Sequence, residues 1–167
     1  MDAITAAPST ATRLFCLKDC QHVSVCDLTG VERFIVWAIR WRASAHDDAV
    51  FAADCLQDSF DRAGLRGAQP AFEQFVAAAR DEPLHCPAAQ RLGCWRLSAL
   101  EAHSLHAIAC LQAGVIGEAW TTLTRVCGIA QAGRALQPLQ DLAAALARSG
   151  GSINRWKFEP APGYAPS

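Results

Sequence analysis

The sequence has almost no net charge and no long apolar run. Its 15 Lys and Arg residues stand against 16 Asp and Glu residues, which gives a formal net charge of −1 at pH 7. Nucleic acids and anionic membrane surfaces attract strongly basic proteins, so neither is expected to be the main partner of this chain. A membrane-spanning helix needs roughly 18 consecutive apolar residues, and the sequence contains no such run. We expect neither a nucleic acid nor a membrane among its partners.

The N-terminal segment MDAITAAPSTATR lacks the apolar stretch of a secretory signal peptide. Lysine is almost absent, since Lys18 and Lys157 are the only lysines among the basic residues. Heavy use of Arg and Ala is typical of a GC-rich bacterial genome. We therefore expect a bacterial, cytoplasmic protein whose eight cysteines stay reduced. Their thiols would be buried, bind a metal or carry out redox chemistry.

Several sequence motifs of catalysis and cofactor binding are also missing. The chain contains no Cys-x-x-Cys pair, no Cys-x-x-Cys-His haem attachment motif and no His-Glu-x-x-His metalloprotease motif. It has no Gly-x-Ser-x-Gly nucleophile motif and no glycine-rich loop for phosphate. These absences argue against covalent c-type haem, zinc proteases, serine hydrolases of the α/β class and nucleotide-binding enzymes.

What the sequence does contain is the composition of one globular domain. Its 167 residues are 51% hydrophobic and 19% charged. No segment alternates convincingly between apolar and polar residues, as a half-buried strand would. We expect an all-α, single-domain bundle of about five or six helices with an irregular Cys-rich N-terminal arm. The expected parts are the arm over residues 1–28, the helical domain over 29–151 and an extended Pro-rich tail over 152–167.

Capping boxes and helical periodicity predict where the helices lie. Thr29 with Glu32, and Ser98 with Glu101, fit the capping box, in which a hydroxyl accepts from the third amide and a carboxylate reaches back. Pro138 is expected at the first position of the last helix. The expected helices cover about residues 29–45, 48–63, 70–82, 99–112, 116–127 and 138–149.

The same periodicity predicts which side chains face the core. The inward residues are Val31, Phe34, Ile35, Ala38, Trp41 and Ala45 in the first helix, and Phe51, Cys55, Leu56, Ser59 and Phe60 in the second. Arg33 and Arg40 fall on the opposite, outer face of the first helix. Arg42 falls on the apolar face, so it needs either a path to solvent or a buried acidic partner. The candidate partners are Asp47, Asp48 and Glu101.

The segment His85–Cys110 concentrates residues that bind metals. On the fourth expected helix, His103, His106 and Cys110 lie at i, i+3 and i+7, within one narrow stripe. If the preceding loop folds back over the helix start, two further thiols meet this stripe. The predicted zinc ligands are Cys86, Cys94, His103 and His106. The two thiols are further apart in sequence than is usual for structural zinc, so the alternative is a core thiol at Cys110 with histidines at a polar border.

A second cluster of metal-binding residues lies in the N-terminal arm. Its potential ligands are Cys16, Cys20, His22 and Cys26. A short segment without a core can gain order from a metal, but this spacing also departs from common zinc and iron–sulfur patterns. The alternatives are thiols packed under a loop, a joint site with His103 and His106, or a redox-sensitive thiol near Lys18.

Aromatic and basic residues on the first helix favour a protein-binding surface. Trp37 and Trp41, together with Arg33 and Arg40, have the side-chain chemistry that dominates protein interfaces. The expected partner is another protein or a second copy of this chain.

Together these patterns favour a small helical binding or regulatory protein. Zn²⁺, at a structural or sensory site, is the only cofactor that we expect. Two alternatives remain open. One is a thiol-dependent enzyme or redox sensor that uses a Cys/His pair, either Cys110 with His106 or Cys86 with His85. The other is a structural subunit whose thiols only fill the core.

Overall fold

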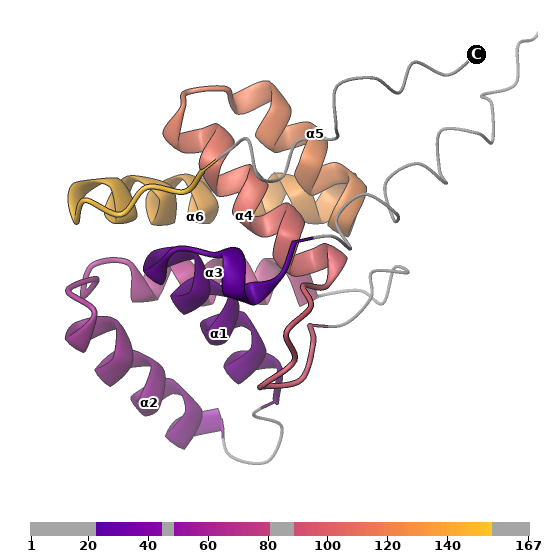
Figure 1. Cartoon of the computed structure of the whole chain (residues 1–167). Coiled ribbons are helices and arrows are strands. Elements are labelled where there is room, and N and C mark those ends of the chain that lie inside the picture. The colour runs from indigo at the N-terminus through magenta and orange to yellow at the C-terminus, as the bar shows by residue number, and fades with distance from the viewer. Residues whose placement is uncertain (1–22, 45–48, 81–88, 155–167) are drawn as a thin grey trace, which may run out of the picture.

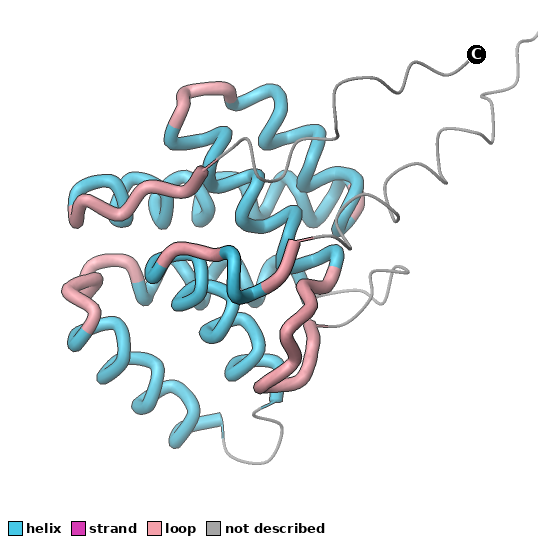
Figure 2. The backbone as a smooth tube through the Cα atoms, viewed as in Figure 1, coloured by secondary structure: helices cyan, strands magenta, loops and turns pink. Residues whose placement is uncertain are grey.

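The computed structural model describes residues 23–44, 49–80 and 89–154. Within these ranges the chain forms six α-helices, one short 3₁₀ helix and no strand, which confirms the all-α prediction (Figure 2). The elements are η3 (Val25–Asp27), α1 (Gly30–Ser44), α2 (Ala49–Arg62), α3 (Gln69–Arg80), α4 (Ala99–Gln112), α5 (Ile116–Cys127) and α6 (Ile129–Arg148). The predicted arm up to residue 22 and the tail from residue 155 lie outside the described residues.

Helix α4 occupies the centre of the fold. It packs against α1, α5 and α6, while α3 packs against α6 and α2 adjoins α1 and α3. Figure 1 shows α5 and α6 on one side of the molecule and α1 to α3 on the other, with α4 running between them. Because α4 has neighbours on most sides, it needs apolar or small residues all round. Eight of its fourteen residues are buried.

Both predicted capping boxes are confirmed. The backbone N–H of Thr29 donates to Glu32 Oε2 at 2.7 Å, and the N–H of Glu32 donates to Thr29 Oγ1 at 3.4 Å. Ser98 and Glu101 exchange the same two hydrogen bonds at the start of α4. The predicted bounds of α4 and α5 match the structure. Helix α4 ends two residues before Gly114 (φ 76°) and α5 ends one residue before Gly128 (φ 83°), and glycine adopts such a positive φ freely.

The predicted outward position of Arg40 is wrong. Its side chain is only 4% exposed and pairs with Glu101, whose side chain is fully buried. The face of α1 that meets the core includes Val36, Ile39 and Arg40, at i, i+3 and i+4. Since apolar residues surround most of α1, the hydrophobic pattern does not define one inner face. The buried Glu101 on α4, which pairs with Arg40, lies on this side of α1.

Two further predictions about the helices are wrong. Phe51 is 59% exposed, because α2 turns Ala52, Leu56 and Phe60 toward the core at i, i+4 and i+8. The last helix begins at Ile129, with Pro138 in its interior. Proline removes one backbone donor, but α6 buries residues on both sides of it, and this burial outweighs the lost hydrogen bond.

The Arg40–Glu101 pair also fixes the segment that precedes α4. Arg40 Nε and Nη2 donate to the two carboxylate oxygens of Glu101 at 3.0 and 2.8 Å. Arg40 also donates to the carbonyls of Cys94 and Arg96. Glu101 in turn accepts from the N–H groups of Gln90 and Ser98. One buried pair therefore joins α1, α4 and residues 90–98.

We expect Glu101→Ala to lower the free energy of unfolding by about 3–5 kcal/mol, because it leaves the Arg40 guanidinium buried without a counter-charge. The matched control is Glu73→Ala, which removes the Arg42–Glu73 pair, whose side chains are 26% and 25% exposed. That loss should stay below about 1 kcal/mol. Urea denaturation followed by circular dichroism measures both. Equal losses in the two variants would contradict the role given to Arg40 and Glu101.

Candidate functional site

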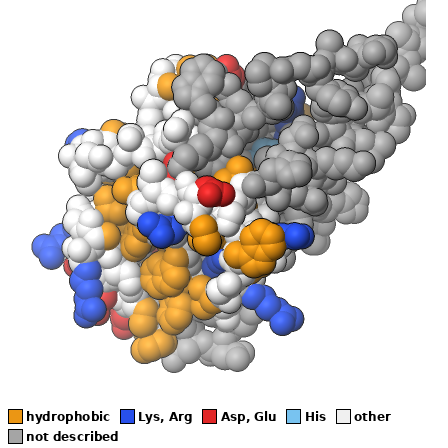
Figure 3. Space-filling model, viewed as in Figure 1, with side chains coloured by type: hydrophobic (Ala, Val, Ile, Leu, Met, Phe, Trp, Pro, Cys, Tyr) orange, Lys and Arg blue, Asp and Glu red, His pale blue; other side chains and the backbone are white. Residues whose placement is uncertain are grey.

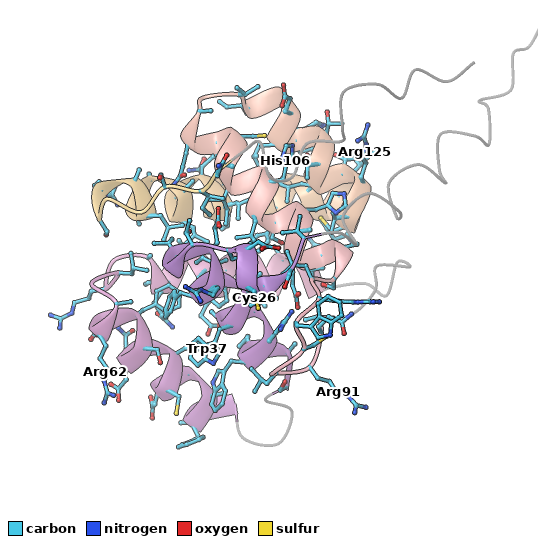
Figure 4. The ribbon with its side chains drawn as sticks, in the orientation of Figure 1. Cys26, Trp37, Arg62, Arg91, His106 and Arg125 are labelled. Atoms are coloured by element: carbon cyan, nitrogen blue, oxygen red, sulfur yellow. The ribbon has the colours of Figure 1, made fainter. Side chains whose placement is uncertain are left out.

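The last turns of α4 and the first turn of α5 bring three potential metal ligands together. His106 and Cys110 are one helical turn apart on α4, and Glu118 lies in the first turn of α5. A short turn through Gly114 (φ 76°) connects the two helices, so that the end of α4 faces the start of α5. Figure 4 marks His106 on α4 in the region beside α5.

The three potential ligand atoms of this group lie close together. Cys110 Sγ lies 3.5 Å from His106 Nε2 and 3.7 Å from Glu118 Oε2. The three ligand atoms all lie within 4.8 Å of one another. Zinc bond lengths and tetrahedral angles imply separations of about 3.4–3.6 Å between ligand atoms. Two of the three separations are therefore close to those of a bound ion, and rotation of the Glu118 side chain would close the third.

Burial changes steadily across the group. Cys110 is fully buried, His106 is half-buried and Glu118 is exposed. The thiol is thus fixed by packing inside the fold, whereas the carboxylate sits at the surface and can move. An ion held here would have its sulfur ligand inside and its oxygen ligand at the solvent side. Glu118 forms the solvent-exposed edge of the group.

His103 lies one turn before His106 on α4 but does not belong to the group of three. Its Nδ1–H donates to the carbonyl of Ala99 at 2.6 Å, which fixes the ring against its own helix. Burial lowers the pKa of His103 below its usual value, and the nearby charge of Arg125 lowers it further, while the bond to Ala99 acts in the opposite direction. His103 is therefore a partly buried histidine whose surroundings favour the neutral ring.

The other predicted ligands do not join this group. Cys94 is half-buried in the segment before α4, and Cys26 is exposed in η3. Neither these two nor His103 is part of the only three-ligand group found among residues 23–44, 49–80 and 89–154. The remaining candidates lie outside the described residues: Cys16, Cys20, His22, His85 and Cys86. His106 is therefore the one predicted zinc ligand within the described residues that belongs to this group, with Cys110 and Glu118 beside it.

Glu118 is the member of this group that the sequence patterns did not predict. The pattern that could have revealed it is the short turn between two adjacent helices, which places the first turn of α5 beside the last turns of α4. An acidic residue in that first turn then lies near any ligand at the end of α4. A search limited to cysteine and histidine spacing cannot find such a carboxylate.

The predicted interface residues are placed on a largely apolar face. Trp37 and Trp41 are half-buried and stack with 5.8 Å between ring centroids, and Trp41 Nε1–H donates to the carbonyl of Ala52. Arg33 is exposed, whereas Arg40 is buried and cannot contribute to a surface. Figure 3 shows hydrophobic side chains gathered on this face of the molecule, with Lys or Arg side chains around them.

Arg42, the predicted charge on an apolar face, pairs with an acid that was not among its candidate partners. Arg42 Nε donates to Glu73 Oε2 on α3 at 2.9 Å. Both side chains are about one-quarter exposed, at 26% and 25%. The candidate partner Glu101 is bound by Arg40 instead, and Asp47 and Asp48 lie outside the described residues.

We expect the stability of the protein to decrease below about pH 6.5 partly because of His103. In the unfolded chain this ring takes up a proton near that pH, whereas burial lowers its pKa in the folded state. Protonation therefore favours unfolding until the pH falls through the folded-state pKa. His103→Gln removes this contribution. Urea denaturation over a pH series should show a smaller decline for the variant, and an identical decline in both proteins would refute the assignment.

Comparisons with known proteins do not assign this chain to a family. No family model, no curated protein and no solved structure gives a significant match to the chain. Within the described part of the chain, no helix has both the length and the apolar character needed to cross a bilayer.

Proposed function

We propose that this chain is a small helical regulatory protein that binds a divalent transition-metal ion through His106, Cys110 and Glu118. The observation that supports this most directly is the approach of three different ligand atoms to within 4.8 Å of one another. They come from two helices and combine a buried thiol with an exposed carboxylate. No other three-ligand group occurs in the described ranges.

The types of ligand favour Zn²⁺. A thiolate and an imidazole select zinc or copper over Mg²⁺ and Ca²⁺, which bind oxygen ligands. With a neutral imidazole, the thiolate of Cys110 and the carboxylate of Glu118 carry two negative charges that a divalent ion neutralises. A neighbouring carboxylate disfavours a thiolate in the absence of a cation. The same pair of residues therefore supports metal binding better than an isolated, reactive thiolate.

The number and exposure of the ligands favour a regulatory site over a structural one. Structural zinc sites are closed by four protein ligands, whereas three protein ligands leave a coordination position for water or an exogenous group. Here Glu118 is exposed, so an ion can enter and leave from the solvent side. The core around α4 is already formed by apolar packing of α1, α5 and α6. Binding would tighten the α4–α5 connection rather than create the fold.

The thiol-enzyme alternative rests on the distance between Cys110 Sγ and His106 Nε2, which is 3.5 Å. A nucleophilic thiol must reach its substrate, and Cys110 is fully buried. A metal ion needs only the space between the ligands and is the better fit. The other proposed pair, Cys86 with His85, lies outside the described residues.

We expect protein purified without a histidine tag to bind about one Zn²⁺ per chain. Cys110→Ser, His106→Gln and Glu118→Gln should each weaken binding at least about tenfold, because each removes a direct ligand. Competition titration with a chromophoric chelator measures the affinity. Co²⁺-loaded protein should show a thiolate-to-metal charge-transfer band that is lost in Cys110→Ser.

The matched control is Cys55→Ser, which changes a half-buried thiol on α2 outside the group. It should leave both the affinity and the charge-transfer band unchanged. Cys86→Ser, Cys16→Ser and Cys20→Ser test the rival ligands that lie outside the described residues. Zinc affinity that depends on those thiols, and not on Cys110, would overturn the proposed site.

The reactivity of Cys110 separates metal binding from thiol chemistry. We expect native Cys110 to react with iodoacetamide more slowly than exposed Cys26, because the buried thiol is inaccessible. Mass spectrometry of peptides after timed alkylation gives both rates. A Cys110 that reacts faster than Cys26 near neutral pH would favour the enzyme alternative. Reaction of the buried Cys110 and Cys127 only on unfolding, with no metal bound, would favour the structural-subunit alternative.

A further inference from the structure

The segment before α4 presents exposed interface-type side chains on a fixed backbone. Residues 89–97, AQRLGCWRL, turn at Gly93 (φ 86°), where the N–H of Cys94 donates to the carbonyl of Arg91 at 3.1 Å. Leu92 is 43% exposed and Trp95 is 58% exposed. Arg91 and Arg96 are exposed as well. The guanidinium carbon of Arg96 lies 4.6 Å from the centre of the Trp95 ring.

Hydrogen bonds from outside the segment hold its backbone at residues 90, 94, 95 and 96. Buried Arg40 donates to the carbonyls of Cys94 and Arg96. Glu101 accepts from the N–H of Gln90 at 2.8 Å. On the other side, the N–H of Val25 donates to the carbonyl of Trp95 at 2.8 Å. The exposed side chains therefore extend from a backbone with little freedom to rearrange.

This arrangement differs from that of an ordinary surface loop. Removing an ion pair from water is costly, and the hydrogen bonds gained must offset that cost. Here the pair of Arg40 and Glu101 directs its hydrogen bonds to a segment that leaves a tryptophan and a leucine in solvent. A rigid segment loses little conformational entropy when it binds a partner. Trp and Arg are also the side chains that contribute most to protein interfaces.

The geometry points to a docking site for an acidic protein segment that carries an apolar side chain; this inference is independent of metal binding. The apolar side chain packs against Trp95 and Leu92, and flanking carboxylates pair with Arg91 and Arg96. Residues 89–98 contain two arginines and no acidic residue, so their charge complements an acidic partner. Figure 4 shows Arg91 extending from this part of the molecule.

A protein segment fits this surface better than a polyanion does. Binding to nucleic acid or an anionic membrane draws its affinity from many basic contacts. This site offers two arginines on a chain whose formal net charge is −1. On the adjoining η3, Asp27 Oδ2 accepts from the N–H of Ser24, so that carboxylate already has a local hydrogen bond. Affinity then also depends on apolar contacts with Trp95 and Leu92. A flexible peptide with an apolar side chain can make these contacts.

The test uses the full chain and a short synthetic peptide of Asp and Glu with a central Leu-Phe pair. Two matched peptides replace either the acidic residues by Lys or the Leu-Phe pair by Ala. The readout is the indole N–H resonance of Trp95 in ¹H–¹⁵N spectra, assigned with Trp95→Phe. We expect the acidic apolar peptide to shift this resonance at saturable concentrations. The two matched peptides should bind at least about tenfold more weakly.

Charge reversal at the site is compared with an equal reversal elsewhere. Arg91→Glu/Arg96→Glu should lower affinity for the acidic peptide at least about tenfold. Arg134→Glu/Arg148→Glu makes the same change at exposed positions on α6 and should leave affinity unchanged. No shift of Trp95 up to millimolar peptide, or equal losses in both double variants, overturns the proposal. Stronger binding of single-stranded DNA or phosphatidylserine vesicles than of the peptide also overturns it, in favour of a polyanion site.

A second variant tests the positioning role of Arg40. Arg40→Lys keeps the charge beside Glu101 but loses the planar fork that reaches two carbonyls. We expect faster hydrogen exchange at residues 94–98 together with weaker peptide binding. Faster exchange with unchanged affinity would overturn the claim that a fixed backbone matters for docking.

Discussion

The ion pair of Arg40 and Glu101 is the contact on which the relation between the two halves of the chain depends. Arg40 comes from α1 and Glu101 from the first turn of α4, and both are buried. Neither charge would be stable in this environment without the other. The pair therefore tolerates only arrangements in which α1 and the start of α4 lie side by side. The capping box of α4 uses the same carboxylate, so the start of the helix and its position against α1 are fixed together.

Because α4 is fixed at its first turn, its last turns also have a fixed position. Cys110 lies about two and a half turns after Glu101 on a largely buried helix. Apolar packing against α5 and α6 holds that end. The candidate metal ligands lie at the end of α4, and the exposed segment of residues 89–97 precedes its start. Both are thus positioned by the same helix. Their chemistry is independent, but both need α4 in its place. A change that displaces α4 would disturb both, which is why charge reversal and ligand removal are better probes than substitutions in the core.

Features that depend on residues close together in the chain, such as the capping boxes, could be predicted from the sequence. The inward face of a helix could not, because it depends on residues far away in the chain. The capping boxes at Thr29 and Ser98 involve residues within three positions, so pattern alone located them. Arg40 and Phe51 were placed on the wrong sides of their helices, because several faces of α1 and α2 are apolar enough to turn inward. Local preference favours proline at the first position of a helix, which predicts a helix start at Pro138. Burial along α6, a property of the assembled fold, keeps the helix continuous through it.

The candidate metal site also combines one contact between near neighbours in the chain with one between distant residues. His106 and Cys110 share a face of α4 because of helical geometry, which sequence spacing reveals. Glu118 joins them only because α5 folds back beside α4, and no spacing rule for zinc ligands describes that contact. The fully buried thiol gives the group one ligand with a fixed position, and the exposed carboxylate gives it one that can adapt. In the proposed metal site, the exposed Glu118 is the ligand that adjusts to an ion without unpacking the core, because packing already fixes Cys110.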